Sequence, residues 1–258
     1  MAYAAHGAGN LRDLGGLATA DGRVVRDGTL LRSEAPQTLD ELSRERLGAV
    51  PVKLIFDLRS DGEHNPPPAL WAEGSEPEVV HAELFSMVDD DAGESGGMDI
   101  EAVLADESGA AAREFMHGYY RRLVDRFAGP LLADFAERVG VRGQTPVVVH
   151  CTAGQDRTGM LIALVLLALR VPREAVVADY MVTLEHFTLE RVLGWFDDRL
   201  GPGDATRTTA VTPLSVAPEY LERALDLVLE RCGSFDAYWH AAGVDAERLE
   251  AMRRALLI

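Results

Sequence analysis

The sequence predicts a single domain of the α/β class, and three observations indicate this class. Residues 147–150 are three valines and a histidine, a run of β-branched residues that is typical of a buried strand. The apolar segment from Met160 to Leu169 follows and is too long for a buried strand, so it predicts a helix. A second apolar run, Val52 to Arg59, lies between segments with helical spacing, and strands that alternate with helices are typical of α/β domains.

The opening segment predicts turns, a short strand and a helix. Asn10 to Gly16 ends in paired glycines, which permit backbone conformations that other residues avoid. Residues 27–34 predict a turn and a short strand. Thr38 and Glu41 have the spacing of a helix capping box, so we expect a helix that starts at Thr38 and extends to about Leu47.

Two further strands are expected before residue 85. Val52 to Arg59 is mostly apolar and ends in charged side chains, which is typical of a strand buried on both faces. Because ligands of open α/β sheets gather beyond the carboxyl ends of such strands, we expect Asp57 near the mouth of the sheet. Residues 60–68 contain three consecutive prolines and predict irregular backbone, and Val79 to Leu84 predicts the next strand.

Residues 86–109 predict a surface insertion within a single domain that spans residues 1–258. The composition changes there to Asp, Glu, Gly and Ser, with few large apolar residues to form a core. The acidic run from Asp89 to Asp91 is more typical of a solvated loop than of a metal site.

The other segments predict helices and one long loop. Each helix is indicated by one of two signals. One is apolar side chains at steps of three or four residues, and the other is Pro or Asp at the start of the helix. Residues 201–209 are rich in Gly and Thr and are typical of a hinge-like loop. The expected helices are Ala110 to Phe127, Pro130 to about Val139, Arg173 to about Leu184, His186 to Leu200, one that opens at Pro218 and one capped by Asp245.

The chemistry of the chain is predicted in the loop between the 147–150 strand and the helix that begins near Thr158. Backbone N–H groups of residues 152–157 can point into this loop, and the positive end of the helix dipole lies behind them, so the loop offers a cradle for an anion. The same field favours the nucleophilic thiolate form of Cys151. Arg157 adds a fork of donors that suits two phosphate oxygens, and the Thr158 hydroxyl can reach the sulfur.

With its Cys-x5-Arg-Thr-Gly spacing, the segment 150–159 resembles the signature loop of cysteine-dependent protein tyrosine phosphatases, most closely their atypical bacterial branch. The Asn-x-Arg-Asp-Leu-Gly-Gly opening, Leu31-Arg-Ser33 and Ala178-Asp-Tyr180 are similar to segments of the same branch. The resemblance implies a phosphatase fold with a central, mostly parallel sheet of four to five strands flanked by helices. It also implies a C-terminal helical region, in which residues 186–216 form either a lid over the site or an ordinary pair of packing helices.

The resemblance implies phosphomonoester hydrolysis through a phosphocysteine. Cys151 attacks the phosphorus, the loop holds the phosphate oxygens, and Thr158 stabilises the departing thiolate. Asp57 matches the segment that carries the general acid in the family, and Asp156 is the second candidate. The other interpretations are an ion pair at the strand end for Asp57 and a helix N-cap for Asp156. The expected phosphate-binding residues are Thr152, Ala153, Gly154, Gln155, Asp156 and Arg157.

Gln155 stands where the relatives of this branch carry Lys. A neutral amide can donate a hydrogen bond but cannot supply the extra cation that a ligand with several phosphates needs. The expected substrate is therefore a phosphotyrosine-containing protein or a small phosphate ester, and a phosphoinositide is the less favoured alternative.

Composition limits the partners and cofactors. The net charge of -17 argues against nucleic-acid binding, which depends on Lys and Arg. The run from Met160 to Leu169 is too short to cross a bilayer, so no integral membrane association is expected. The histidines are scattered without metal-site spacing, and we expect neither a metal nor another cofactor. Two distant cysteines and no recognisable signal peptide favour a cytoplasmic protein, with export by a signal-free route as the alternative.

Two other functions fit parts of the pattern. A rhodanese-type sulfurtransferase also presents a cysteine in a strand-loop-helix cradle, but Arg157 followed by Thr158 favours phosphate chemistry. A non-catalytic module that binds phosphotyrosine needs only the loop, whereas every catalytic residue type is present here. The purely structural interpretation of Cys151 is a small buried side chain in a turn.

Overall fold

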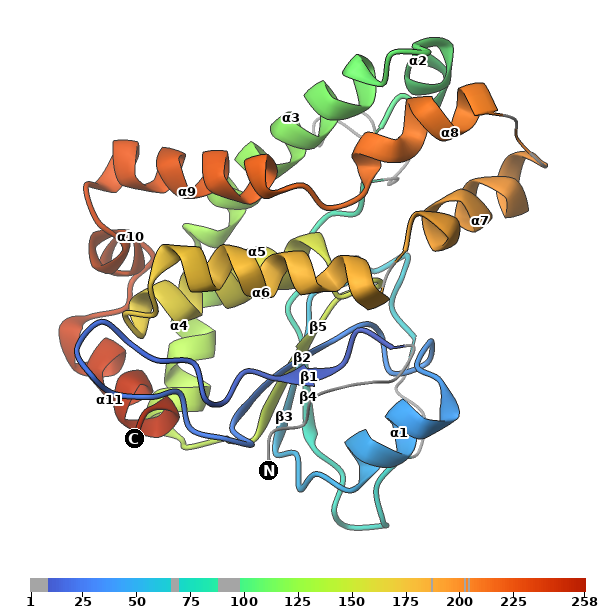
Figure 1. Ribbon diagram of the computed structural model, residues 1–258. Coiled ribbons are helices and arrows are strands. Elements are labelled where there is room, and N and C mark those ends of the chain that lie inside the picture. The colour runs from blue at the N-terminus through green and yellow to red at the C-terminus, as the bar shows by residue number, and fades with distance from the viewer. Residues whose placement is uncertain (1–8, 66–69, 88–97, 187, 202, 204) are drawn as a thin grey trace.

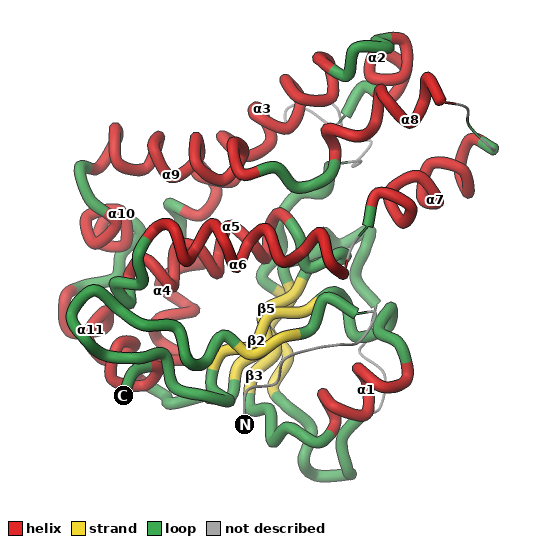
Figure 2. Tube along the Cα trace, in the orientation of Figure 1, coloured by secondary structure: helices red, strands yellow, loops and turns green. Residues whose placement is uncertain are grey.

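The fold is organised around a five-stranded sheet with the strand order β1-β2-β5-β3-β4 (Figures 1 and 2). In a computed structural model, residues 9–65, 70–87, 98–186, 188–201, 203 and 205–258 are described. β1 and β2 are antiparallel, and the pairs β2–β5, β5–β3 and β3–β4 are parallel. The predicted, mostly parallel sheet is thus confirmed. Its strands are β1 Arg12–Asp13, β2 Leu30–Ser33, β3 Leu54–Asp57, β4 Glu78–His81 and β5 Val147–His150.

Both faces of the central strands β2, β3 and β5 are buried, which explains why each of these strands begins with a run of apolar residues. Leu31, Ile55 and Val148 belong to a small core beneath α1 (Glu41–Gly48). Their neighbours along the strands, Leu30, Phe56 and Val149, belong to the large core on the other face, because successive side chains of a strand point to opposite sides. Figure 1 shows α1 and α5 on opposite sides of the sheet.

The large core is covered by the remaining helices. Among the described residues, no helix has the length and hydropathy that a membrane span requires. The helices are α2 Ile100–Ala105, α3 Ala110–Phe127, α4 Pro130–Ala136 with the π-helix η1 Glu137–Val141, α5 Asp156–Ala168, α6 Arg173–His186, α7 Leu189–Leu200, α8 Ala205–Val211 with the 3-10 helix η2 Thr212–Leu214, α9 Pro218–Cys232, α10 Phe235–Ala241 and α11 Ala246–Leu256. Pro130 and Pro218 open their helices and Asp245 caps α11, as predicted.

The register of the three central strands brings three turns to one edge of the sheet. His150 of β5 is paired with Ser33 of β2 on one side and with Asp57 of β3 on the other. Because these strands are parallel, the segments that follow them leave the sheet at the same edge. The signature loop is therefore flanked by the turns after β2 and β3.

The N-cap of the first helix is Asp40, two residues later than the predicted Thr38, and α1 begins at Glu41. The Asp40 carboxylate accepts a hydrogen bond from the backbone N–H of Ser43 and caps α1. The Thr38 hydroxyl donates instead to the Ala35 carbonyl oxygen. Two capping residues compete in this sequence, and the aspartate forms the cap.

Two segments predicted as irregular contain short helices. α2 lies within the predicted insertion 86–109, and α8 begins within the predicted loop 201–209 and ends two residues beyond it. The two helices contact each other, and α8 also contacts α3 (Figure 1). Helices this short depend on such tertiary packing, so local sequence preference does not reveal them. The acidic run from Asp89 to Asp91 lies outside the described residues.

Candidate active site

Cys151 lines a cavity of about 160 Å³. β5 carries the chain to this cysteine, whose exposed fraction is 3%, and α5 carries the chain away after the loop. The loop residues that line the cavity are Cys151, Thr152, Ala153, Gln155, Asp156 and Arg157. The other described lining residues are Glu63, Ser86, Met87, Met98, Tyr119, Val192 and Leu214.

The carbonyl oxygens of the signature loop are held on its outer side. Asn10 donates from Nδ2 to the carbonyls of Ala153 and Gly154, at 3.0 Å each, and Arg32 donates to Gly154 at 2.8 Å. With the carbonyls engaged on the outside, the backbone N–H groups are left to face an anion in the cavity. Gly154 has a φ of 66°, and a Cβ there would lie 2.4 Å from the Ser33 carbonyl oxygen, so only glycine fits.

Motifs that lie far apart in the sequence meet beneath this loop. Asp179 pairs with Arg12 at 2.8 Å and with Arg32 at 2.6 Å, and Arg12 also donates to Asn10. Burial raises the pKa of Asp179, but the two guanidinium charges lower it below its ordinary value. The opening motif, Leu31-Arg-Ser33 and Ala178-Asp-Tyr180 therefore form one buried network that holds the outer side of the loop.

Glu63 holds the guanidinium of Arg157. Its two carboxylate oxygens lie 2.5 Å from Nη1 and 2.9 Å from Nη2, and Thr152 donates its hydroxyl to Glu63 at 2.7 Å. Burial raises the pKa of Glu63, but the hydrogen bonds and charge of Arg157 lower it to about 2, so the carboxylate is ionised. Sequence reasoning missed this residue, although the argument that placed Asp57 at the sheet edge applies equally to the turn after β3.

Asp57 lies apart from the residues that line the cavity. It is 1% exposed and accepts hydrogen bonds from Nε and Nη2 of Arg59, the shortest at 2.7 Å. Burial raises the pKa of Asp57, but Arg59 and the His150 charge lower it to about 2. An ionised carboxylate clamped by arginine has no proton to donate. This geometry corresponds to the ion pair at the strand end and does not support a general acid here.

Asp156 lines the cavity and accepts a hydrogen bond from the buried Tyr120. Tyr120 donates its hydroxyl to Asp156 Oδ1 at 2.8 Å, and the Tyr120 and Tyr180 hydroxyls lie 2.7 Å apart. Burial raises the pKa of Asp156 to about 6, against the lowering effects of the Tyr120 hydrogen bond and the Arg157 charge. The N-cap interpretation is wrong, since Gln155 occupies the cap position and Asp156 is the first residue of α5.

Two predicted side chains are buried with unused hydrogen-bonding atoms. Within the described part of the chain, Gln155 Nε2 and Thr158 Oγ1 have no hydrogen-bond partner. The expected bond from Thr158 to the sulfur is therefore not formed in this structure, although the hydroxyl is fully buried. Gln155 lines the cavity, where its amide can serve a ligand oxygen. No three described His, Cys, Asp or Glu side chains are grouped so that they could hold a metal ion.

Comparison with known proteins agrees with this geometry. The profile of the tyrosine phosphatase family matches residues 3–258. Over 276 residues the chain is 31% identical to the triple specificity protein phosphatase PtpB of Mycobacterium tuberculosis, and the match covers 97% of each protein. Over 254 residues it is 32% identical to a candidate tyrosine-protein phosphatase of Cupriavidus necator, with 93% of this chain and 84% of the relative covered. The solved structure of Tk-PTP in its active form matches at 18% identity and a TM-score of 0.33, over 76% of this chain and 94% of that chain. Since the family profile spans nearly the whole chain and includes the loop around Cys151, this protein belongs to the tyrosine phosphatase family.

Proposed function

We propose that the chain hydrolyses phosphotyrosine in proteins through a phosphocysteine on Cys151. The observation that carries this proposal is that Cys151 and Arg157 line one cavity, in a loop whose Ala153 and Gly154 carbonyl oxygens are held by Asn10. Such a loop binds a tetrahedral dianion with its amides and one guanidinium, and phosphoryl transfer requires little more than this positioning and charge stabilisation.

In the first step the Cys151 thiolate forms a bond to phosphorus while the bond from phosphorus to the tyrosine oxygen breaks. Asp156 donates its proton to the leaving oxygen and becomes a carboxylate. The position of Asp156 in the cavity, with a pKa raised to about 6, supports this role. Thr158 then has a buried hydroxyl available for the sulfur when the thiolate departs.

In the second step water attacks the phosphocysteine. The Asp156 carboxylate takes a proton from this water, the sulfur–phosphorus bond breaks, and inorganic phosphate and the Cys151 thiolate are released. The same carboxyl group acts as acid and then as base, and it ends the cycle protonated, so no other proton donor is needed.

The lining of the cavity favours an aromatic ester with one phosphate. Met87, Met98, Tyr119, Val192 and Leu214 supply apolar contacts for a ring. Among the described residues that line the cavity, Arg157 is the single Lys or Arg, so the lining offers one cation to one phosphate. Both features support phosphotyrosine over a phosphoinositide.

The direct test is a parallel assay of the purified, reduced protein on phosphotyrosine, phosphoserine and phosphoinositide substrates. We expect kcat/KM to be highest for phosphotyrosine peptides. Higher turnover of thiosulfate in the presence of cyanide than of any phosphate ester would overturn the proposal in favour of sulfur transfer.

Gln155→Lys is expected to raise kcat/KM for a phosphoinositide relative to a phosphotyrosine peptide by about tenfold, because the ammonium adds a cation beside the single phosphate site. The same two substrates are assayed with Gln144→Lys, which adds an identical charge at a half-buried position that contacts Glu78 and does not line the cavity. An unchanged ratio in Gln155→Lys, or an equal change in both variants, would show that the missing cation does not set the preference.

Asp156→Asn is expected to lower kcat/KM about 100-fold for phenyl phosphate, whose leaving group needs a proton, and far less for 4-nitrophenyl phosphate. In the unsubstituted protein, activity on phenyl phosphate is expected to fall as the pH rises through about 6, where Asp156 loses its proton. In Asp156→Asn this fall in activity is expected to be absent. Asp57→Asn is the comparison. It breaks a buried ion pair and lowers the free energy of unfolding by about 3 kcal/mol, but it leaves the substrate ratio unchanged. A changed ratio of the two substrates in Asp57→Asn, with an unchanged ratio in Asp156→Asn, would assign the role of general acid to Asp57.

We also propose that residues 186–216 act as a lid. Val192 of α7 and Leu214 of η2 line the cavity, and Arg191 of α7 pairs at 2.9 Å with Glu34, which is 1% exposed and follows β2. A contact between a lid helix and a buried core carboxylate suits a closed state that opens for large substrates.

Arg191→Gln is expected to speed hydrogen exchange in α7 roughly fivefold, with the rest of the fold unaffected, because the tie to Glu34 is lost. Arg173→Gln, which removes an exposed ion pair between α6 and Asp226, serves as the comparison. Equal exchange in α7 of all three proteins would argue for ordinary packing helices.

We place the activity in the cytoplasm, where Cys151 stays reduced. Both cysteines are free, which is compatible with a reducing compartment. Detection of the protein mainly in the culture medium of intact cells would contradict this placement.

A further inference from the structure

We propose that Tyr120 is a positioning residue for the phosphatase reaction: its hydroxyl fixes the rotation of the Asp156 carboxyl group so that one oxygen faces the leaving group. This inference rests on the proposed function, because it gives Asp156 the role of acid and base. Tyr120 itself does not touch the substrate, since its exposed fraction is 1% and it is not among the residues that line the Cys151 cavity.

Three helices contribute one hydroxyl or carboxyl group each to a buried chain of hydrogen bonds. Tyr180 of α6 lies 2.7 Å from the Tyr120 hydroxyl on α3, which lies 2.8 Å from Oδ1 of Asp156 at the start of α5. A tyrosine hydroxyl carries a single proton. When Tyr120 donates to Asp156, Tyr180 must therefore donate to Tyr120, so the order of the chain is Tyr180, Tyr120, Asp156.

This order assigns different tasks to the two oxygens of Asp156. Oδ1 accepts the hydrogen bond from Tyr120 and so faces this buried tyrosine. The proton that reaches the leaving oxygen must then be carried on Oδ2. Proton transfer requires the acid within hydrogen-bonding reach of its target, so a carboxyl group free to rotate would spend part of its time in an unproductive orientation.

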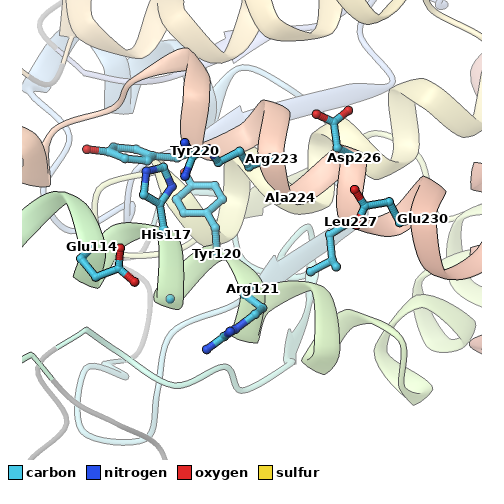
Figure 3. A pocket seen from close by; sticks show the side chains of 11 residues that line it. Glu114, His117, Tyr120, Arg121, Tyr220, Arg223, Ala224, Asp226, Leu227 and Glu230 are labelled. Carbon is cyan, nitrogen blue, oxygen red and sulfur yellow. The ribbon is translucent and has the colours of Figure 1, made fainter.

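The tyrosine that holds Asp156 is itself firmly held. The Tyr120 ring lies 5.9 Å from the Tyr220 ring and 6.4 Å from the Tyr180 ring, measured between centroids. Figure 3 shows Tyr120 beside His117 among the residues of α3 and α9 that line a cavity of about 350 Å³. Tyr180 is pressed against Gly159, where an added Cβ would lie 2.8 Å from the Tyr180 ring. Tyr120 and Tyr180 are each 1% exposed, so their hydroxyl groups are kept away from bulk water.

The test compares Tyr120→Phe, Asp156→Asn and the double variant on phenyl phosphate and 4-nitrophenyl phosphate. Tyr120→Phe is expected to lower kcat/KM about tenfold for phenyl phosphate, and much less for 4-nitrophenyl phosphate, whose leaving group departs without a proton. In the Asp156→Asn background, Tyr120→Phe should produce no further change in the ratio of the two substrates, because the group that it positions is already gone.

The pH dependence of activity on phenyl phosphate is a second measurement, and it would not change if Tyr120 had a purely structural role. The Tyr120 hydrogen bond lowers the pKa of Asp156, so its removal raises that pKa and moves the basic limb for phenyl phosphate to higher pH, while the plateau falls. The other groups that act electrostatically on Asp156, or respond to it, are unchanged in this variant: Arg32 of β2, Tyr119 of α3, Arg157 of α5, Tyr180 of α6 and Tyr220 of α9.

Tyr238→Phe is the matched control. Tyr238 is also buried, at 2% exposed, and its hydroxyl donates to the Val124 carbonyl of the same helix α3, away from Asp156. An equal loss on both substrates in Tyr120→Phe, as expected of Tyr238→Phe, would overturn the inference. If Asp156→Asn leaves the substrate ratio unchanged, the proposed acid itself fails. If only Tyr120→Phe leaves the substrate ratio unchanged, Tyr120 is not a positioning residue, while the role of Asp156 stands.

Should Tyr120→Phe not fold, Tyr180→Phe removes the donor to Tyr120 and is expected to shift the ratio about threefold in the same direction.

Discussion

Cys151→Ser is expected to lower turnover of phosphotyrosine peptides by about 10⁴-fold, because a serine hydroxyl in this loop is a far weaker nucleophile than a thiolate. The variant should still bind inorganic phosphate. The carbonyls of Ala153 and Gly154 remain held by Asn10, so the amide face of the loop stays formed. In the proposed mechanism the sulfur attacks as a thiolate. Replacing it by a neutral hydroxyl removes repulsion of the phosphate dianion, so affinity measured by calorimetry should be unchanged or higher.

Cys232→Ser is the matched control for this experiment. Cys232 lies at the end of α9 and is not among the residues that line the cavity, so its substitution should leave turnover and phosphate affinity unchanged. Residual turnover of the Cys151→Ser protein at more than about one hundredth of the original rate would rule out attack by the sulfur of Cys151.

Arg157→Lys is expected to lower kcat/KM about 10³-fold even though the positive charge is kept. A lysine ammonium cannot donate in parallel to two phosphate oxygens, as a guanidinium does. It also cannot reproduce the two contacts with Glu63, at 2.5 and 2.9 Å, so this ionised carboxylate would lose its partner beside the phosphate site. Weaker binding of inorganic phosphate should accompany the loss of turnover.

Arg253→Lys provides the comparison for Arg157→Lys. Arg253 is also buried, at 8% exposed, and donates to the Ala168 carbonyl and to Asp236 on the far side of the core. Its substitution should lower the melting temperature without changing phosphate affinity. Similar phosphate affinity in all three proteins would show that charge alone, without the fork of donors, is sufficient at residue 157.

The main features of the fold were predictable because they depend on local pattern. The valines of residues 147–149 are apolar on both faces, which is possible only for a strand with a layer on each side, and both layers are present. Pro130, Pro218 and Asp245 start helices for reasons contained in their own covalent structure. α2 and α8 were not predictable, since packing against other helices stabilises them.

The two candidate acids illustrate the limit of sequence reasoning at the site. Asp57 was placed at the correct edge of the sheet, and its register partner is His150, one residue before Cys151. Side-chain direction then distinguishes the two candidates, because Asp57 pairs with Arg59 while Asp156 lines the cavity, and on this ground we propose Asp156 as the acid. Strand order predicts where a residue lies to within a few ångströms, but proton transfer depends on which way its carboxyl group points.

The amino-acid sequence by itself determined the class of fold and predicted the nucleophile and the phosphate-binding loop, because each depends on the residue pattern of a contiguous segment. Only the tertiary structure brought Glu63 to Arg157, Tyr120 to Asp156 and Asp179 to two arginines. These partners are 36 to 167 residues apart in the chain. Contacts over such distances arise from the packing of whole elements, which a local pattern does not encode.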